Sequence, residues 1–130
     1  MVKKLMFCVA VAAVMAGVPA VAQQPEPVKR TVLQKNDFPG DKMTTLVVLI
    51  EIAPNFVVAK HTHPGLETGY VQDGEVTLTY DGQPEKTVKK GDGYTNPASV
   101  PHIAKAGPQG VKLISTFVVD KDKPLAAPAP

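Results

Sequence analysis

Apolar and polar residues alternate in short runs along most of this 130-residue chain. Runs rich in Val, Ile, Thr, Tyr and Phe recur between residues 31 and 119, and turns containing Gly, Pro, Asn or Asp separate them. Apolar residues at helical spacing are always interrupted by Gly or Pro, so no helix is expected. The pattern therefore predicts an all-β fold of about eight or nine short strands, arranged as a small β-barrel or jelly roll.

The predicted strands are Thr31–Gln34, Thr44–Ile52, Phe56–His63, Glu67–Gln72, Glu75–Tyr80, Lys86–Lys89, His102–Lys105 and Val111–Val119. Glu67–Gln72 and Glu75–Tyr80 are expected to form a hairpin, because Asp73-Gly74 between them is a strong turn signal. Thr44–Ile52 is apolar on both faces, so we expect it to be central in a sheet or covered by a partner. In so short a chain this strand predicts a homodimer.

The first 22 residues, Met1–Ala22, have the pattern of a secretory signal peptide. Two lysines give a positive start, an uncharged apolar run follows from Leu5 to Ala16, and Ala20-Val21-Ala22 places small residues where signal peptidase cuts. The apolar run has about 12 residues, whereas a membrane span needs ~20. We therefore expect cleavage after Ala22 and secretion across the inner membrane, with no membrane attachment afterwards. The periplasm is the expected destination, and residues 1–22 do not distinguish it from the space outside the cell.

The chain is expected to divide into a signal peptide (1–22), a flexible leader (23–30), one folded domain (31–119) and a disordered Pro/Ala-rich tail (120–130). One small domain excludes dinucleotide-binding enzymes of the doubly wound type. The single cysteine, Cys8, leaves with the signal peptide, which excludes a disulfide framework and a thiolate zinc site. The remaining 108 residues carry 12 basic and 12 acidic side chains, so their charge does not favour nucleic acid as a partner.

The three histidines of the chain carry the strongest chemical signal. His61 and His63 are two residues apart in a predicted strand, so both imidazoles should point to one face, together with Val57 and Ala59. That face is expected to be the barrel interior, where imidazoles without a partner would be costly. Glu67 follows past a Pro-Gly turn, and His102 begins a later strand.

Three imidazoles and one carboxylate suit a divalent transition metal such as Fe, Mn, Co, Ni, Cu or Zn. The residues therefore predict a metal site formed by His61, His63, Glu67 and His102. The ligands do not choose among these metals, and a purely structural metal ion would use the same side chains. Val76, Leu78 and Tyr80 alternate along their strand and should face inward, whereas Lys60 should face solvent.

Two segments resemble the two conserved motifs of the cupins, in particular the small single-domain bacterial cupins of type 2. The first is Asn55, five residues, His61-Thr62-His63, three residues, Glu67, six residues and Gly74. The second is Gly91, five residues, Pro97, one residue, Ser99, two residues and His102. The resemblance spans residues 31–119. It implies a double-stranded β-helix, and it matches the same four side chains to the metal ligands of the family.

The motifs depart from the family at positions that are not ligands. Asn55 and Ser99 stand where the family has Gly, and Ala106 stands where it has Asn. Asn tolerates a left-handed backbone, so we expect the turn at Asn55 to survive.

The resemblance leaves three functions open. The first and preferred one is a metal-dependent dioxygenase acting on a small enolisable compound, in which Glu67 also takes a proton as a catalytic residue. The second is a non-redox isomerase or lyase that uses the same metal as a Lewis acid. The third is a non-catalytic protein of the cell envelope that binds a metal or a small ligand. The fold alone does not choose among them.

Overall fold

The computed structural model describes residues 25–130, so the predicted signal peptide lies outside the described residues. This part of the chain is all-β, as predicted, and every strand pairing is antiparallel. Its strands are β1 (Val28–Asn36), β2 (Met43–Ile52), β3 (Val57–Thr62), β4 (Gly65–Tyr80), β5 (Lys86–Lys89), β6 (Gly93–Asn96), β7 (His102–Asp120) and β8 (Ala127–Pro128). Within residues 25–130, no helix is long and apolar enough to span a membrane.

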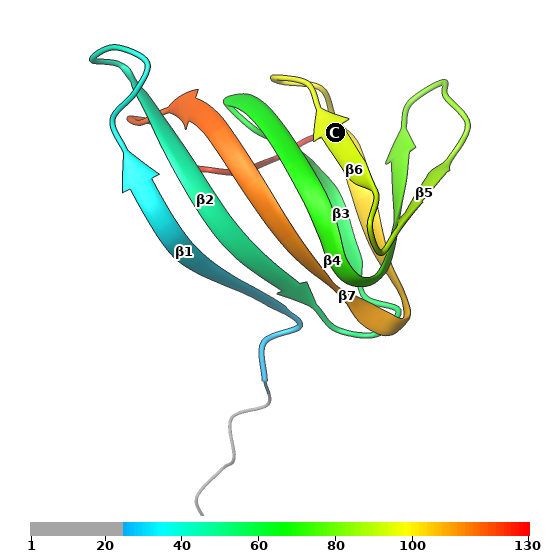
Figure 1. Ribbon diagram of the computed structural model, residues 1–130. Coiled ribbons are helices and arrows are strands. Elements are labelled where there is room, and N and C mark those ends of the chain that lie inside the picture. The colour runs from blue at the N-terminus through cyan, green and yellow to red at the C-terminus, as the bar shows by residue number, and fades with distance from the viewer. Residues whose placement is uncertain (1–24) are drawn as a thin grey trace, which may run out of the picture.

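Two long, bent strands, β4 and β7, build both layers of the domain (Figure 1). Residues 65–74 of β4 pair with residues 111–119 of β7, and β2 and β6 extend this first layer. Residues 76–80 of β4 pair with residues 102–106 of β7, and β3 and β5 extend the second layer. The two layers enclose the core.

The core consists of the inward-facing side chains of strands in which buried and more exposed residues alternate. Val48, Ile50 and Ile52 come from β2, and the inward face of β7 runs from Val111 through Leu113 and Phe117 to Val119. Val76 and Leu78 are fully buried and Tyr80 is packed against the core, which confirms the predicted inward face of that segment. The expected central position of Thr44–Ile52 is also found, because β2 lies between β1 and β7.

The predicted hairpin around Asp73-Gly74 is wrong. Asp73 and Gly74 stay paired with Lys112 and Val111 of β7, and the register shifts on either side of them. These irregularities are β-bulges, which bend a strand instead of reversing it. Gly74 has a φ of +74°, and a side chain there would collide with the carbonyl oxygen of Gly110. The two halves of the expected hairpin therefore form one 16-residue strand.

The ends of the described chain are more ordered than we expected. Val28 of the predicted flexible leader already pairs with Ile52. The predicted disordered tail continues as β8, in which Ala127 pairs with Thr62 and Pro128 with His61. Backbone pairing and the packing of Leu125 against the core explain the order, even though the composition is poor in large apolar residues.

Candidate metal centre

The three histidines meet at one end of the domain. His61 lies near the end of β3, His63 follows that strand, and His102 begins β7. Each offers a nitrogen atom, and these nitrogens lie within 4.8 Å of one another. The ring centroids are 4.3 Å apart for His61 and His102 and 4.9 Å apart for His61 and His63. The structure thus brings together three of the four predicted ligands as a group that can hold a metal ion.

Every one of these histidines is oriented through its Nδ1 atom. His61 Nδ1 lies 2.9 Å from Ala59 O, His63 Nδ1 lies 2.7 Å from Leu125 O, and His102 Nδ1 lies 3.0 Å from Val100 O. A carbonyl oxygen only accepts, so each Nδ1 carries a proton and donates it. The neutral ring then keeps its lone pair on Nε2, which is the arrangement found in metal-bound histidines.

The route by which His61 reaches the interior differs from the predicted one. Val57 is 47% exposed and Ala59 is also exposed, so neither shares an inward face with the histidines. The register of β3 against β7 shifts between Val58 and His61. This bulge turns both Val58 and His61 toward the same cavity, although three positions separate them.

Burial also favours the neutral form of two rings. Loss of solvent lowers the pKa of His61 and of His102, and the neighbouring imidazoles lower both values further. Hydrogen bonds to Ala59 O and Val100 O oppose this shift without cancelling it. Both rings are therefore available as uncharged ligands at neutral pH.

Glu67 is buried beside the histidines and held at both oxygens. Its Oε1 accepts hydrogen bonds from Tyr94 Oη at 2.9 Å and from Ser115 Oγ at 2.9 Å. Its Oε2 accepts one from Asn96 Nδ2 at 2.7 Å. Burial raises the pKa of Glu67, but contacts with His63, Asn96 and Ser115 outweigh it and lower the pKa to about 2. The side chain is a carboxylate at neutral pH.

The contact between Glu67 and His63 points to a cation between them. His63 Nε2 lies 3.1 Å from Glu67 Oε2, and His63 Nδ1 already donates its own proton to Leu125 O. Two lone pairs at this distance repel unless a proton or a metal ion lies between them. Two neighbouring ligands with bonds of about 2.1 Å to one ion are roughly 3 Å apart, so the separation fits a shared metal.

Three residues that support Glu67 were not predicted as part of the site. Tyr94 and Asn96 lie on β6, which was not among the predicted strands, and Ser115 lies on β7. The signal for Ser115 was present, because it is the one hydroxyl among the buried apolar residues of the Val111–Val119 strand. Gly69 leaves space for the ring of Tyr94, since a Cβ there would be 2.2 Å from Tyr94 Cζ.

Tyr80 and Lys60 lie at the border of the site. The Tyr80 hydroxyl donates to Asn96 Oδ1, and the Tyr80 ring centroid is 6.0 Å from that of His102. Burial raises the pKa of Tyr80, so its hydroxyl keeps its proton. Lys60 is not simply solvated as predicted, because its Nζ is 3.1 Å from Asp81 Oδ2 and its side chain is only 28% exposed.

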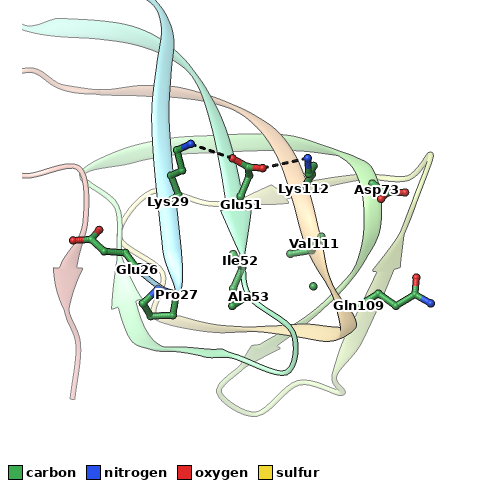
Figure 2. Close-up of a pocket in the computed structure, with 11 residues that line it drawn as sticks. Glu26, Pro27, Lys29, Glu51, Ile52, Ala53, Asp73, Gln109, Val111 and Lys112 are labelled. Carbon is green, nitrogen blue, oxygen red and sulfur yellow. Dashed lines mark ion pairs between the residues drawn. The ribbon is translucent and has the colours of Figure 1, made fainter. Parts of the chain in front are cut away.

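The metal centre opens into a narrow space, which we call the inner cavity. Its volume is about 40 Å³, and its walls are mostly apolar side chains from β2, β4 and β7. A larger hollow of about 400 Å³ is lined by the start of β1, the end of β2 and residues 109–112 (Figure 2). There the Glu51 carboxylate lies between two lysines, 3.9 Å from Lys29 Nζ and 3.2 Å from Lys112 Nζ. These three charged groups are therefore paired with one another.

Comparisons with known proteins agree with this fold. Residues 48–117, more than half of the chain, match the family described as Cupin domain. The structure is similar to the DMSP lyase DddQ from Ruegeria pomeroyi DSS-3, with a TM-score of 0.66, 16% identity and coverage of 79% of this chain and 52% of that one. The chain thus spans about half the length of that lyase.

Two further structures are covered over most of their length. A double-stranded β-helix protein from Klebsiella pneumoniae has a TM-score of 0.65 at 21% identity, with 82% of this chain and 88% of that one covered. An RmlC-like cupin from Shewanella frigidimarina NCIMB 400 has a TM-score of 0.60 at 28% identity, with 74% and 79% covered. The comparison with curated proteins finds no match. The extent of the family match shows that this chain belongs to the cupin domain family.

Proposed function

We propose that this protein is an exported, metal-dependent dioxygenase that acts on a small enolisable organic compound. The observation that carries the proposal is the set of three histidines whose Nδ1 atoms all donate to backbone carbonyls, so that three Nε2 lone pairs converge on one narrow cavity. When bound by His61, His63, Glu67 and His102, one divalent transition metal (Fe, Mn, Co, Ni, Cu or Zn) would supply a Lewis acid and, if redox-active, a site for dioxygen chemistry.

The protein groups divide the work around that ion. The histidines contribute no charge, and Glu67 contributes one negative charge, so the site would keep a net positive charge that favours an enolate. Glu67 Oε2 lies beside His63, and this oxygen would accept a proton from the substrate on release from the ion. Tyr94 and Ser115 hold Oε1 and keep the carboxylate in place during that transfer.

The cavity limits the size of the substrate. About 40 Å³ is far below the roughly 300 Å³ or more of sites that enclose drug-sized ligands. Its walls include Ile50, Val58, Leu78 and Phe117, an apolar lining that suits a gas such as dioxygen. These features support a compound of a few carbon atoms over a large aromatic one.

Oxygen uptake tests the proposal. The protein, loaded separately with Fe, Mn, Co, Ni, Cu and Zn, is mixed with a panel of small β-diketones and 2-oxo acids in an oxygen electrode. The metal-free protein is the control. Dioxygen consumption that depends on a redox-active metal is expected. Turnover that persists without dioxygen and with Zn would overturn the oxygenase and favour the isomerase or lyase. Tight binding without any turnover would favour the non-catalytic binder.

We also propose that the protein is a homodimer formed through the outer face of the first layer. On that face Leu49 is in register with Ile114, and Ile114 with Tyr70, which is 50% exposed. Leu66, 42% exposed, is in register with Val118. These side chains form two apolar rows, separated by the row of Thr116 and Thr68, that a second copy would cover. Sedimentation at micromolar concentration should give a dimer for the wild type and a monomer for Ile114→Lys, and a monomeric wild type would contradict this proposal.

Export has its own test. The support is the pattern of residues 1–22, with a positive start, an apolar run and small residues before the expected cleavage point. Expression of the full chain in a bacterium followed by mass spectrometry of the periplasmic fraction should find a protein that begins at Gln23. Retention of the uncleaved chain in the cytoplasm would contradict export.

A further inference from the structure

A second cavity adjoins the metal centre at the open edges of the two layers. We call it the outer cavity; its volume is about 250 Å³, and it lies between β1, β3 and the C-terminal residues 126–128. Arg30, Val58 and His61 line both the inner and the outer cavity. The two cavities therefore meet at these three side chains, on either side of His61.

Arg30 is directed to this place by the register of β1. It pairs with Ile50, whose side chain is buried in the core, so Arg30 lies on the inward side of the strand. Its neighbour Lys29 pairs with Glu51 on the opposite side and forms an ion pair with it. The Arg30 side chain is nevertheless exposed at this rim, so its guanidinium stays accessible to a ligand.

The charge of the outer cavity is positive. Its lining includes the side chains of Arg30 and Lys60 and no carboxylate. Lys60 is compensated by Asp81 at 3.1 Å, whereas Arg30 forms no ion pair with any of residues 25–130. One uncompensated guanidinium therefore lines a cavity that shares His61 with the metal centre.

We propose that Arg30 binds a carboxylate of the substrate, so that the substrate is a small enolisable carboxylic acid. This inference rests on the proposed function for the enolisable part, which would lie at the three histidines. A guanidinium presents two parallel N–H donors that match the two oxygens of a carboxylate, which gives both affinity and orientation. Bound at both ends, the acid would span the outer and inner cavities in one orientation.

The test compares two probes that differ in a single charge, 2,4-dioxopentanoate and its methyl ester. Titration calorimetry with the Ni-loaded protein gives a dissociation constant for each, without any need for turnover. The wild type should bind the acid about tenfold more tightly than the ester, since a charge-assisted pair at a partly exposed site is worth about that factor. Arg30→Gln should bind both probes equally, and Arg30→Lys should recover only part of the preference.

Lys29→Gln is the matched control, because it removes a cation from the adjacent position on the opposite side of the same strand. It should keep the preference for the acid. Equal binding of acid and ester by the wild type, or an unchanged preference in Arg30→Gln, would overturn the inference. The proposed function fails separately: an Arg30-dependent preference without any dioxygen consumption keeps this inference and removes the oxygenase.

Discussion

Replacing Glu67 by Gln removes one charge from the buried cluster and leaves its shape almost unchanged. The pKa of Glu67 falls from its ordinary 4.5 to about 2 on folding. The unfolded chain therefore binds the proton more readily, so the carboxylate stabilises the fold above pH 4.5 and this contribution is lost as the pH falls toward 2. A shift of this size corresponds to about 3 kcal/mol.

We expect the metal-free Glu67→Gln variant to be about 3 kcal/mol less stable than the metal-free wild type at pH 7. At pH 3 the wild type should have lost about 2 kcal/mol of this contribution, so the gap between the two proteins should narrow to about 1 kcal/mol. Urea unfolding of both proteins in the presence of a chelator, at pH 7, 5, 4 and 3, gives the difference in their free energies of unfolding at each pH.

Glu75→Gln is the matched control on the same strand, because Glu75 is 39% exposed and its ion pair with Lys89 is weak, with 4.0 Å between Oε2 and Nζ. It should change the free energy of unfolding by less than about 0.5 kcal/mol at any of these pH values. If Glu67→Gln were as stable as the wild type at pH 7, or if the gap stayed constant down to pH 3, the hydrogen-bonded carboxylate described above would be refuted.

Three further outcomes are expected. His61→Ala or His102→Ala should sharply lower the metal content per chain measured by mass spectrometry, whereas Lys60→Ala should not; full occupancy in either histidine variant would refute the ligand assignment. Ser99→Gly should raise the free energy of unfolding by about 1 kcal/mol in urea titrations, because Ser99 has a φ of 60° that a side chain disfavours; a destabilised variant would contradict this reasoning. Deleting residues 124–130 removes Leu125 O, the carbonyl oxygen that orients the His63 ring. Metal titration should then show about 10- to 100-fold weaker binding. Unchanged affinity would show that this contact is dispensable.

The grouping of the histidines could be predicted because it depends on short-range order. His61 and His63 are separated by one residue, and the Pro-Gly turn after them returns the chain toward the same end of the domain. The alternation of Val76, Leu78 and Tyr80 likewise fixed their side of the strand before the structure was known. Such features need no knowledge of which strands pair.

The errors arise where long-range pairing overrides a local signal. Asp73-Gly74 is a turn signal in isolation, but the partners that keep it in a strand are almost 40 residues away in the sequence. The bulge that turns Val58 inward depends in the same way on β7. The contact between His63 and Leu125 O has no sequence signature at all, because any residue offers a backbone carbonyl.

Metal analysis of the protein tests the central claim most directly. The mature chain is purified from its native compartment without chelator, and its metal content is measured alongside that of the His102→Ala variant. The arrangement of His61, His63, Glu67 and His102 predicts about one transition-metal ion per wild-type chain and much less in the variant. A wild-type protein that contains no metal, and takes up none on titration with Fe, Mn, Co, Ni, Cu or Zn, would contradict it.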